Sequence, residues 1–103
     1  MLVVTRYRVP PAEGDAFLAE AGRVLALLSV RPGFVHGSVG RAADDEQLWL
    51  LATEWAGAGA YRRALSSYEV KTGATALLST AVDEPTAYEL HLRADAETPS
   101  GGE

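Results

Sequence analysis

The chain has 103 residues and a net charge of −5, with 48% hydrophobic and 22% charged residues, which is typical of one folded soluble domain. This acidic balance disfavours nucleic acid as a partner, and the absence of cysteine excludes disulfides and cysteine metal sites. No apolar run approaches the roughly 20 residues of a membrane span, and the first residues lack the zones of a signal peptide, so we expect a cytoplasmic protein with no membrane partner.

The first third of the chain predicts a strand followed by a helix. Alternating β-branched and aromatic side chains over Leu2–Val9 predict the strand, and Pro10-Pro11 ends it. The helix is predicted by apolar residues that recur at the spacing of one helical face, which are Phe17, Ala21, Val24 and Leu28. Arg31-Pro32-Gly33 then ends this helix.

A hairpin is predicted next, with strands at Phe34–Arg41 and Gln47–Trp55 joined by the polar turn Ala42–Glu46. Side chains of a strand alternate between the two faces of its sheet. One face of the second strand carries Trp49, Leu51, Thr53 and Trp55, and the other carries Leu48, Leu50, Ala52 and Glu54. Both faces are largely apolar, although a strand that meets water on one side normally has one polar face.

A second helical region and a fourth strand complete the predicted elements. Tyr61, Leu65 and Tyr68 lie at i, i+4 and i+7 and predict a buried stripe, with a kink near Ser66-Ser67. Pro85 opens a strand that runs through Arg93. We therefore expect one domain over residues 1–93 and a flexible tail of small polar residues over 94–103.

The order β-α-β-β-α-β predicts an α+β, ferredoxin-like fold, in which a four-stranded antiparallel sheet carries both helical regions on one face. The other face is then uncovered and apolar, which predicts a homodimer through this sheet face. If Arg41 pairs with Gln47, then Val35, Gly37 and Val39 lie on the same face as Trp55, and His36 faces the partner. In that register Gly37 leaves space beside Leu51 for a ligand.

The chain resembles the antibiotic biosynthesis monooxygenase family of dimeric α/β-barrel proteins. The resemblance extends over residues 3–92 and is carried by Arg31-Pro32-Gly33-Phe34, by Trp55 at the end of the third strand and by Tyr61–Ser66 after it. It implies a homodimer whose two sheets form a barrel, with a pocket between sheet and helices in each protomer.

The resemblance also implies a choice of activities. Some members oxidise polycyclic aromatic compounds to quinones with dioxygen and no cofactor, others cleave haem, and others have no known role. The quinone-forming and haem-degrading members use an asparagine and the tryptophan at the end of the third strand. Trp55 matches this tryptophan. This chain contains no asparagine, and we assign Tyr7 to the corresponding place on the first strand. Haem cleavage is disfavoured because no histidine occurs between Trp55 and Ala87.

The candidate site combines catalytic and substrate-binding residues. The catalytic candidates are Trp55 to orient a flat substrate, Tyr7 as a hydrogen-bonding partner and His36 as a general base. The substrate-binding candidates are Tyr61, Arg62, Leu51, Tyr68 and Leu65. Each has a structural alternative, which is core packing for the apolar and aromatic residues and a solvated surface position for His36 and Arg62. We expect neither a metal nor a cofactor.

Two functions follow from these residues. The first is a cofactor-independent monooxygenase that oxidises a flat phenolic or polycyclic aromatic compound with dioxygen. The alternative is a non-enzymatic dimer of the same fold that binds a small ligand or acts in a stress response. A cavity beside Trp55 that is large enough for a multi-ring aromatic favours the enzyme. Filling of that space by Leu65, Tyr68 and Leu77 favours the alternative.

Overall fold

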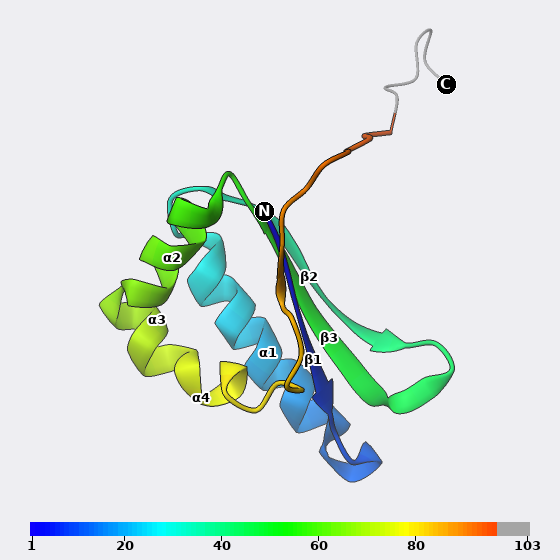
Figure 1. Cartoon of the computed structure of the whole chain (residues 1–103). Helices are drawn as coiled ribbons and strands as arrows, with labels where there is room; N and C mark the ends of the chain where they lie inside the picture. Colours follow the sequence, from blue (N-terminus) through cyan, green and yellow to red (C-terminus); the bar gives the residue numbers. More distant parts are fainter. Residues whose placement is uncertain (97–103) are drawn as a thin grey trace, which may run out of the picture.

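A four-stranded antiparallel sheet with helices packed on one face forms the domain (Figure 1). The computed structural model describes residues 1–96, so most of the predicted tail, residues 97–103, lies outside the described residues. The elements are β1 (Leu2–Arg8), the short 3-10 helix η1 (Pro11–Glu13), α1 (Gly14–Ser29), β2 (Phe34–Ala42), β3 (Asp45–Trp55), α2 (Ala58–Ser66), α3 (Tyr68–Gly73), α4 (Thr75–Leu78) and β4 (Ala87–Tyr88). The strand order β2-β3-β1-β4 confirms the predicted ferredoxin-like fold.

The hairpin of β2 and β3 has a register that differs from the predicted one by two residues. Arg41 pairs with Trp49 rather than with Gln47. Because the difference is even, Gly37 and Val39 still lie on the same face as Trp55, and His36 still lies on the other face. The space predicted beside Gly37 is taken, since a Cβ there would meet Leu25 of α1.

A β-bulge at the start of β2 changes which side chain faces Trp55. Phe34 pairs with Trp55 and His36 pairs with Glu54, so Val35 is the extra residue between them. The prediction that Val35 lies with Trp55 is therefore wrong. Phe34 lies there instead, and its ring meets the Trp55 indole edge to face with 5.3 Å between centroids.

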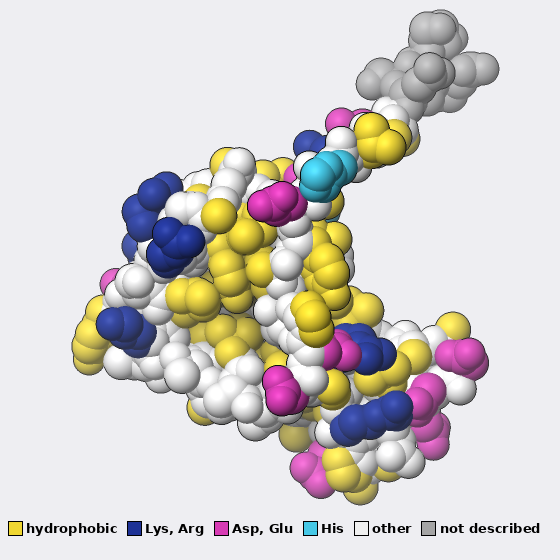
Figure 2. Space-filling model, in the orientation of Figure 1, with side chains coloured by type: hydrophobic (Ala, Val, Ile, Leu, Met, Phe, Trp, Pro, Cys, Tyr) yellow, Lys and Arg dark blue, Asp and Glu magenta, His cyan; other side chains and the backbone are white. Residues whose placement is uncertain are grey.

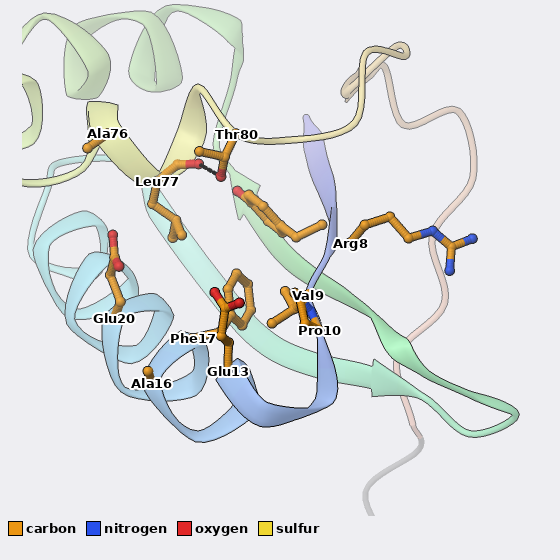
Figure 3. A pocket seen from close by; sticks show the side chains of 11 residues that line it. Arg8, Val9, Pro10, Glu13, Ala16, Phe17, Glu20, Ala76, Leu77 and Thr80 are labelled. Atoms are coloured by element: carbon orange, nitrogen blue, oxygen red, sulfur yellow. Dashed lines mark hydrogen bonds between the residues drawn. The ribbon is translucent and has the colours of Figure 1, made fainter.

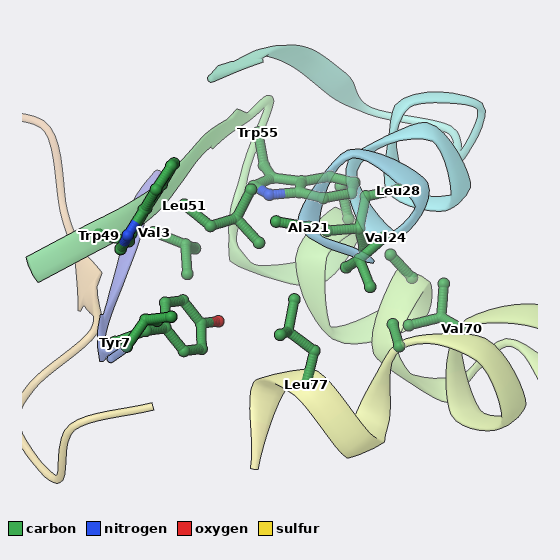
Figure 4. Packing of buried hydrophobic residues seen from close by; sticks show 14 residues of the cluster. Val3, Tyr7, Ala21, Val24, Leu28, Trp49, Leu51, Trp55, Val70 and Leu77 are labelled. Carbon is green, nitrogen blue, oxygen red and sulfur yellow. The ribbon is translucent and has the colours of Figure 1, made fainter. Parts of the chain in front are cut away.

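The core lies between the helices and one face of the sheet (Figure 4). Alternate residues of β1 and β3 point into it, while α1 contributes the predicted stripe of Ala21, Val24 and Leu28. The largest fully buried side chains are Trp55, Tyr7, Leu28, Val24 and Val70. The alternation that predicted the strands thus also determines which side chains form the core.

The second helical region is interrupted at the predicted kink. Ser67 has extended backbone angles (φ −69°, ψ 149°), and its Oγ accepts a hydrogen bond from the Val70 N–H at 3.4 Å. Ser67 is therefore the N-cap of α3. The break changes the helical phase, so Tyr68 does not continue the stripe of Tyr61 and Leu65. Tyr68 is 77% exposed, and its predicted burial is wrong.

The fourth strand is much shorter than the predicted Pro85–Arg93. Of residues 85–93, only Ala87 and Tyr88 pair with β1, where they lie opposite Val3 and Leu2 respectively. Backbone hydrogen bonds from Val82 N–H to Arg6 carbonyl and from Val4 N–H to Thr86 carbonyl hold the preceding segment beside β1. Beyond Tyr88 the chain leaves the sheet, and Leu92 is 94% exposed.

No helix of residues 1–96 covers the other face of the sheet, which we call the open face. It comprises the side chains of Leu2, Val4, Arg6, His36, Ser38, Leu48, Leu50, Ala52 and Glu54. Leu48, Leu50 and Ala52 at its centre are partly exposed rather than buried.

Among the described helices, none is long and apolar enough to cross a membrane.

Candidate functional site

A cavity of about 310 Å³ opens between the end of β1, the start of α1 and α4 (Figure 3). Its three walls come from different parts of the chain, so the fold is required to assemble it. The lining side chains include Tyr7 and Val9 from the β1 side, Glu13, Phe17 and Glu20 from the α1 side, and Leu77 and Thr80 from the α4 side. The cavity therefore combines apolar walls with a few polar groups, as ligand sites commonly do.

Tyr7 lines this cavity from within the core. Its side chain is 1% exposed, its hydroxyl lies 2.8 Å from Thr5 Oγ1, and its ring centroid is 5.1 Å from that of Phe17. Burial raises the pKa of Tyr7 above its ordinary value, and the hydrogen bond with Thr5 offsets part of this rise. Tyr7 is therefore a neutral phenol near neutral pH, able to donate or accept a hydrogen bond.

Trp55 is enclosed at the other end of the same sheet face. It is 1% exposed, and its Nε1–H donates to Thr53 Oγ1 at 2.9 Å. Phe34 covers one part of the indole, and the Tyr61 ring lies 5.6 Å away from it. Trp55 does not line the cavity, which the structure places beside Tyr7 instead. The bulge that brings Phe34 onto Trp55 is one physical reason.

Tyr61 links these two aromatic groups. Its ring packs on Trp55, and its pKa is raised by burial and then by the nearby phenol of Tyr7. Leu51 is buried opposite Thr5 in the sheet, and Leu65 packs against the core. Of the predicted residues, the structure thus brings Trp55, Tyr7, Tyr61, Leu51 and Leu65 into one continuous core region.

The remaining predicted residues lie outside that region. Arg62 and Tyr68 are exposed on α2 and α3. His36 lies on the open face with 61% of its side chain exposed, and its Nε2 is 3.1 Å from Glu54 Oε1. The sheet therefore separates the His36 imidazole from the cavity of its own chain. Glu54 is only 8% exposed and also pairs with Arg93 at 3.3 Å.

Three cavity residues of the α1 side were not predicted as site residues. Glu13, Phe17 and Glu20 lie at i, i+4 and i+7 and so share one side of the helical segment. That spacing was readable in the sequence. The missing information was that α4 packs across from this side, which depends on the break at Ser67.

A second, smaller cavity of about 160 Å³ lies on the open face. Leu48, Leu50 and Gly40 line it together with Arg6 and Ser38, and the surface that these residues expose to the cavity is almost entirely apolar. Within residues 1–96 there is no group of three or more side chains suited to holding a metal ion. The cavity beside Tyr7 is larger than the one on the open face and is lined by both apolar and polar side chains, so we take it as the candidate site for an organic ligand.

Comparison with solved structures finds the same fold in several proteins. SnoaB from Streptomyces nogalater, described as a cofactor-independent oxygenase and solved as a point mutant, is 30% identical, with a TM-score of 0.62 over 79% of this chain and 82% of that chain. A conserved protein from Methanosarcina mazei is 20% identical, with a TM-score of 0.67 over 84% of each chain. A Deinococcus radiodurans protein is 14% identical, with a TM-score of 0.73 over 95% of this chain and all of that one. The last two likenesses establish the fold alone.

Comparison with families gives a more specific result. No curated protein matches the chain significantly. The sequence model of the antibiotic biosynthesis monooxygenases matches residues 1–76, which includes β1 to β3, α1, α2 and α3. Because this match covers well over half of the chain and agrees with the fold and the likeness to SnoaB, the chain belongs to the antibiotic biosynthesis monooxygenase family.

Proposed function

We propose that this protein is a cofactor-independent monooxygenase that oxidises a flat phenolic aromatic compound with dioxygen. The observation that carries the proposal is the cavity beside Tyr7. Its volume of about 310 Å³ is within the range of small-molecule sites, at the lower end, and its walls include the Phe17 ring and the Leu77 side chain. The likeness to SnoaB supports the same kind of reaction.

The reaction needs no external reductant because the substrate supplies all the electrons. A ring methylene conjugated with a phenol or ketone loses a proton, and the resulting anion transfers one electron to dioxygen. The two radicals combine to form a carbon–oxygen bond, and protonation gives a hydroperoxide. Loss of water then leaves a carbonyl group, so one oxygen atom enters the quinone product and the other leaves in water. The four electrons accepted by dioxygen equal those lost when the methylene becomes a carbonyl.

The protein would bind and orient the substrate and accept the proton. The neutral Tyr7 hydroxyl is suited to hydrogen-bonding a substrate oxygen, and it would stabilise negative charge that develops there. Phe17 and Leu77 would hold the flat rings. The carboxylates of Glu13 and Glu20 line the cavity and can accept the proton, whereas His36 lies on the opposite face of the sheet.

Trp55 would act as a positioning residue rather than by touching the substrate. Its indole packs against Tyr61, whose phenol lies near that of Tyr7. Leu51 and Leu65 would support the same core region. We assign no role in this cavity to Arg62 or Tyr68, because both side chains are exposed elsewhere.

We also propose that the protein is a homodimer joined through the open face. The centre of this face is formed by Leu48, Leu50 and Ala52, and a monomer would leave these apolar side chains in water. Leu90 and Leu92, just beyond β4, are exposed as well. A second copy related by a twofold axis would cover the open face, since both partners present the same surface.

The second candidate is a ligand-binding dimer without catalytic activity. Two observations favour it: Trp55 already donates its indole hydrogen to Thr53, and the chain contains no asparagine. Such a protein would hold an aromatic compound in the same cavity without turning it over, for sequestration or in a stress response. Oxygen consumption therefore separates the two candidates, whereas ligand binding does not.

The test is aerobic incubation with a panel of anthrones and hydroquinones without added metal or flavin, monitored by quinone absorbance and by oxygen uptake. We expect product formation by the wild type and a reduction of about 10-fold or more in Tyr7→Phe, which loses the proposed substrate hydrogen bond. Trp55→Phe should show a smaller loss, and Tyr68→Phe should match the wild type. Rates no faster than buffer across the whole panel would contradict the oxygenase proposal, and binding without oxygen uptake would support the second candidate.

A further inference from the structure

The charged groups of the cavity beside Tyr7 are unevenly distributed. Glu13 and Glu20 line it with carboxylates, and neither makes an ion pair or side-chain hydrogen bond within residues 1–96. Each of these two side chains carries a formal negative charge. The wall formed by η1 and α1 therefore presents two negative charges to whatever occupies the cavity.

The cationic residue at the cavity does not compensate these charges. Arg8 lines it, but its guanidinium points away and Nη1 lies 2.6 Å from Asp45 Oδ2 (Figure 3). The same Asp45 carboxylate also accepts a hydrogen bond from the Gln47 N–H, which fixes it on the hairpin. The Arg8 guanidinium thus pairs with a carboxylate of the hairpin, and only the aliphatic part of this side chain borders the cavity.

The other walls of the cavity contain no cationic side chain and few free hydrogen-bonding groups that could bind an anionic ligand. The α4 side contributes Ala76, Leu77 and Thr80, and the Thr80 hydroxyl already donates to the Leu77 carbonyl at 2.7 Å. The Tyr7 hydroxyl is a neutral partner, suited to a substrate hydroxyl or carbonyl. A ligand carboxylate in this cavity would meet two like charges without a compensating arginine or lysine.

We infer that Glu13 and Glu20 make this cavity selective for uncharged aromatic compounds and exclude aromatic carboxylates. The inference rests on the proposed function, because it describes the substrate class of the same cavity. Like charges at contact distances repel even through water, and the repulsion increases where an occupied cavity excludes solvent. Because both glutamates are exposed to solvent, added salt should weaken the effect.

The test compares two fluorescent probes, neutral naphthol and the anionic hydroxynaphthoate, titrated into the full-length protein without oxygen so that binding is measured apart from turnover. We expect naphthol to bind about 10-fold more tightly than hydroxynaphthoate at low ionic strength. In the double variant Glu13→Gln/Glu20→Gln this ratio should fall to about 3-fold or less. The matched control, Asp44→Asn/Glu69→Gln, removes the same charge from the hairpin turn and from α3, and should leave the ratio unchanged.

A second measurement does not depend on the folding of any variant. Raising the salt concentration should lower the ratio of the wild-type affinity for naphthol to that for hydroxynaphthoate, because screening weakens the repulsion of the anionic probe. The inference is overturned if both probes bind the wild type equally, if the double variant keeps the wild-type ratio, or if neither probe binds. Selective naphthol binding without oxidation of any panel compound would instead contradict the oxygenase proposal alone.

Discussion

At the scale of single residues, Tyr7 and Tyr61 bring two phenols into one part of the core. Burial is the largest cause that raises the pKa of each, and the proximity of Tyr7 adds to the rise at Tyr61. Folding therefore favours the protonated form of both side chains. Their stabilising contribution is complete below the unfolded-state pKa of 10.0 and is lost as the pH rises through the higher folded-state values.

This linkage predicts a tyrosine-dependent loss of stability in alkali. Between about pH 9 and about pH 11 the free energy of unfolding of the wild type should fall, as measured by urea denaturation. The fall should be smaller in Tyr7→Phe and in Tyr61→Phe, because each removes one phenol that resists ionisation. Tyr68→Phe serves as the control, since Tyr68 is exposed and should not affect the alkaline loss. Equal alkaline loss in all four proteins would contradict the prediction.

Residue identity alone predicted part of the candidate site. Trp55 and Tyr7 lie on the helix-covered face because strand alternation fixes their direction once one strand residue is known to be buried. The same alternation put His36 on the opposite face, in agreement with the register argument. The sequence predicts a cavity beside Trp55, but the Phe34 ring packs on the indole there. Phe34 reaches this position through a β-bulge that no local sequence pattern marks.

At the scale of elements, the turn between α1 and β2 depends on one glycine. Gly33 has φ +89°, and its carbonyl accepts a hydrogen bond from the Ala56 N–H at 2.7 Å. A Cβ at this position would also collide with the Ala60 methyl group of α2. The turn therefore joins the end of α1, the start of β2 and the loop that precedes α2.

Two glycine substitutions are expected to have opposite effects. Gly33→Ala should lower the free energy of unfolding by about 2 kcal/mol or more, because positive φ and a close contact both oppose a side chain. Gly22→Ala, in the middle of α1, should raise it by about 0.5–1 kcal/mol, since a Cβ there meets nothing within 4 Å and restricts the unfolded chain. Urea denaturation measures both. A neutral Gly33→Ala variant would show that the turn relaxes without cost.

Element boundaries were predictable where local patterns determine them. The amphipathic stripe of α1 and the alternation of β1 and β3 depend on the burial of one face, and the predicted elements agree with the structure. Two predicted features were wrong. The alternation after Pro85 predicted a long strand, but pairing with β1 ends at Tyr88. The predicted stripe carried the phase of Tyr61 and Leu65 on to Tyr68, beside the predicted kink, whereas the Ser67 cap starts another helix with a different phase.

At the scale of the whole molecule, the sheet has one face covered by helices and one face without cover. Hydrophobic side chains are also visible between the helices and the segment that leads to β4 (Figure 2). The open face differs from that region because apolar residues of β1 and β3 meet there with the charged groups of Arg6, His36 and Glu54 around them. An apolar centre with a polar rim is the usual composition of a protein–protein interface.

The proposed homodimer predicts a specific sensitivity to charge at the centre of the open face. Leu50→Glu would place a carboxylate in the proposed interface of each copy, where burial of an unpaired charge costs far more than exposure. Size-exclusion chromatography with light scattering should give twice the chain mass of 10.9 kDa for the wild type and a shift toward 10.9 kDa for this variant. Leu18→Glu is the matched control, since Leu18 is exposed on α1 and away from the open face. It should keep the dimeric mass. A wild-type mass of 10.9 kDa at micromolar concentration would contradict the dimer, because the protein would then be soluble with its open face uncovered.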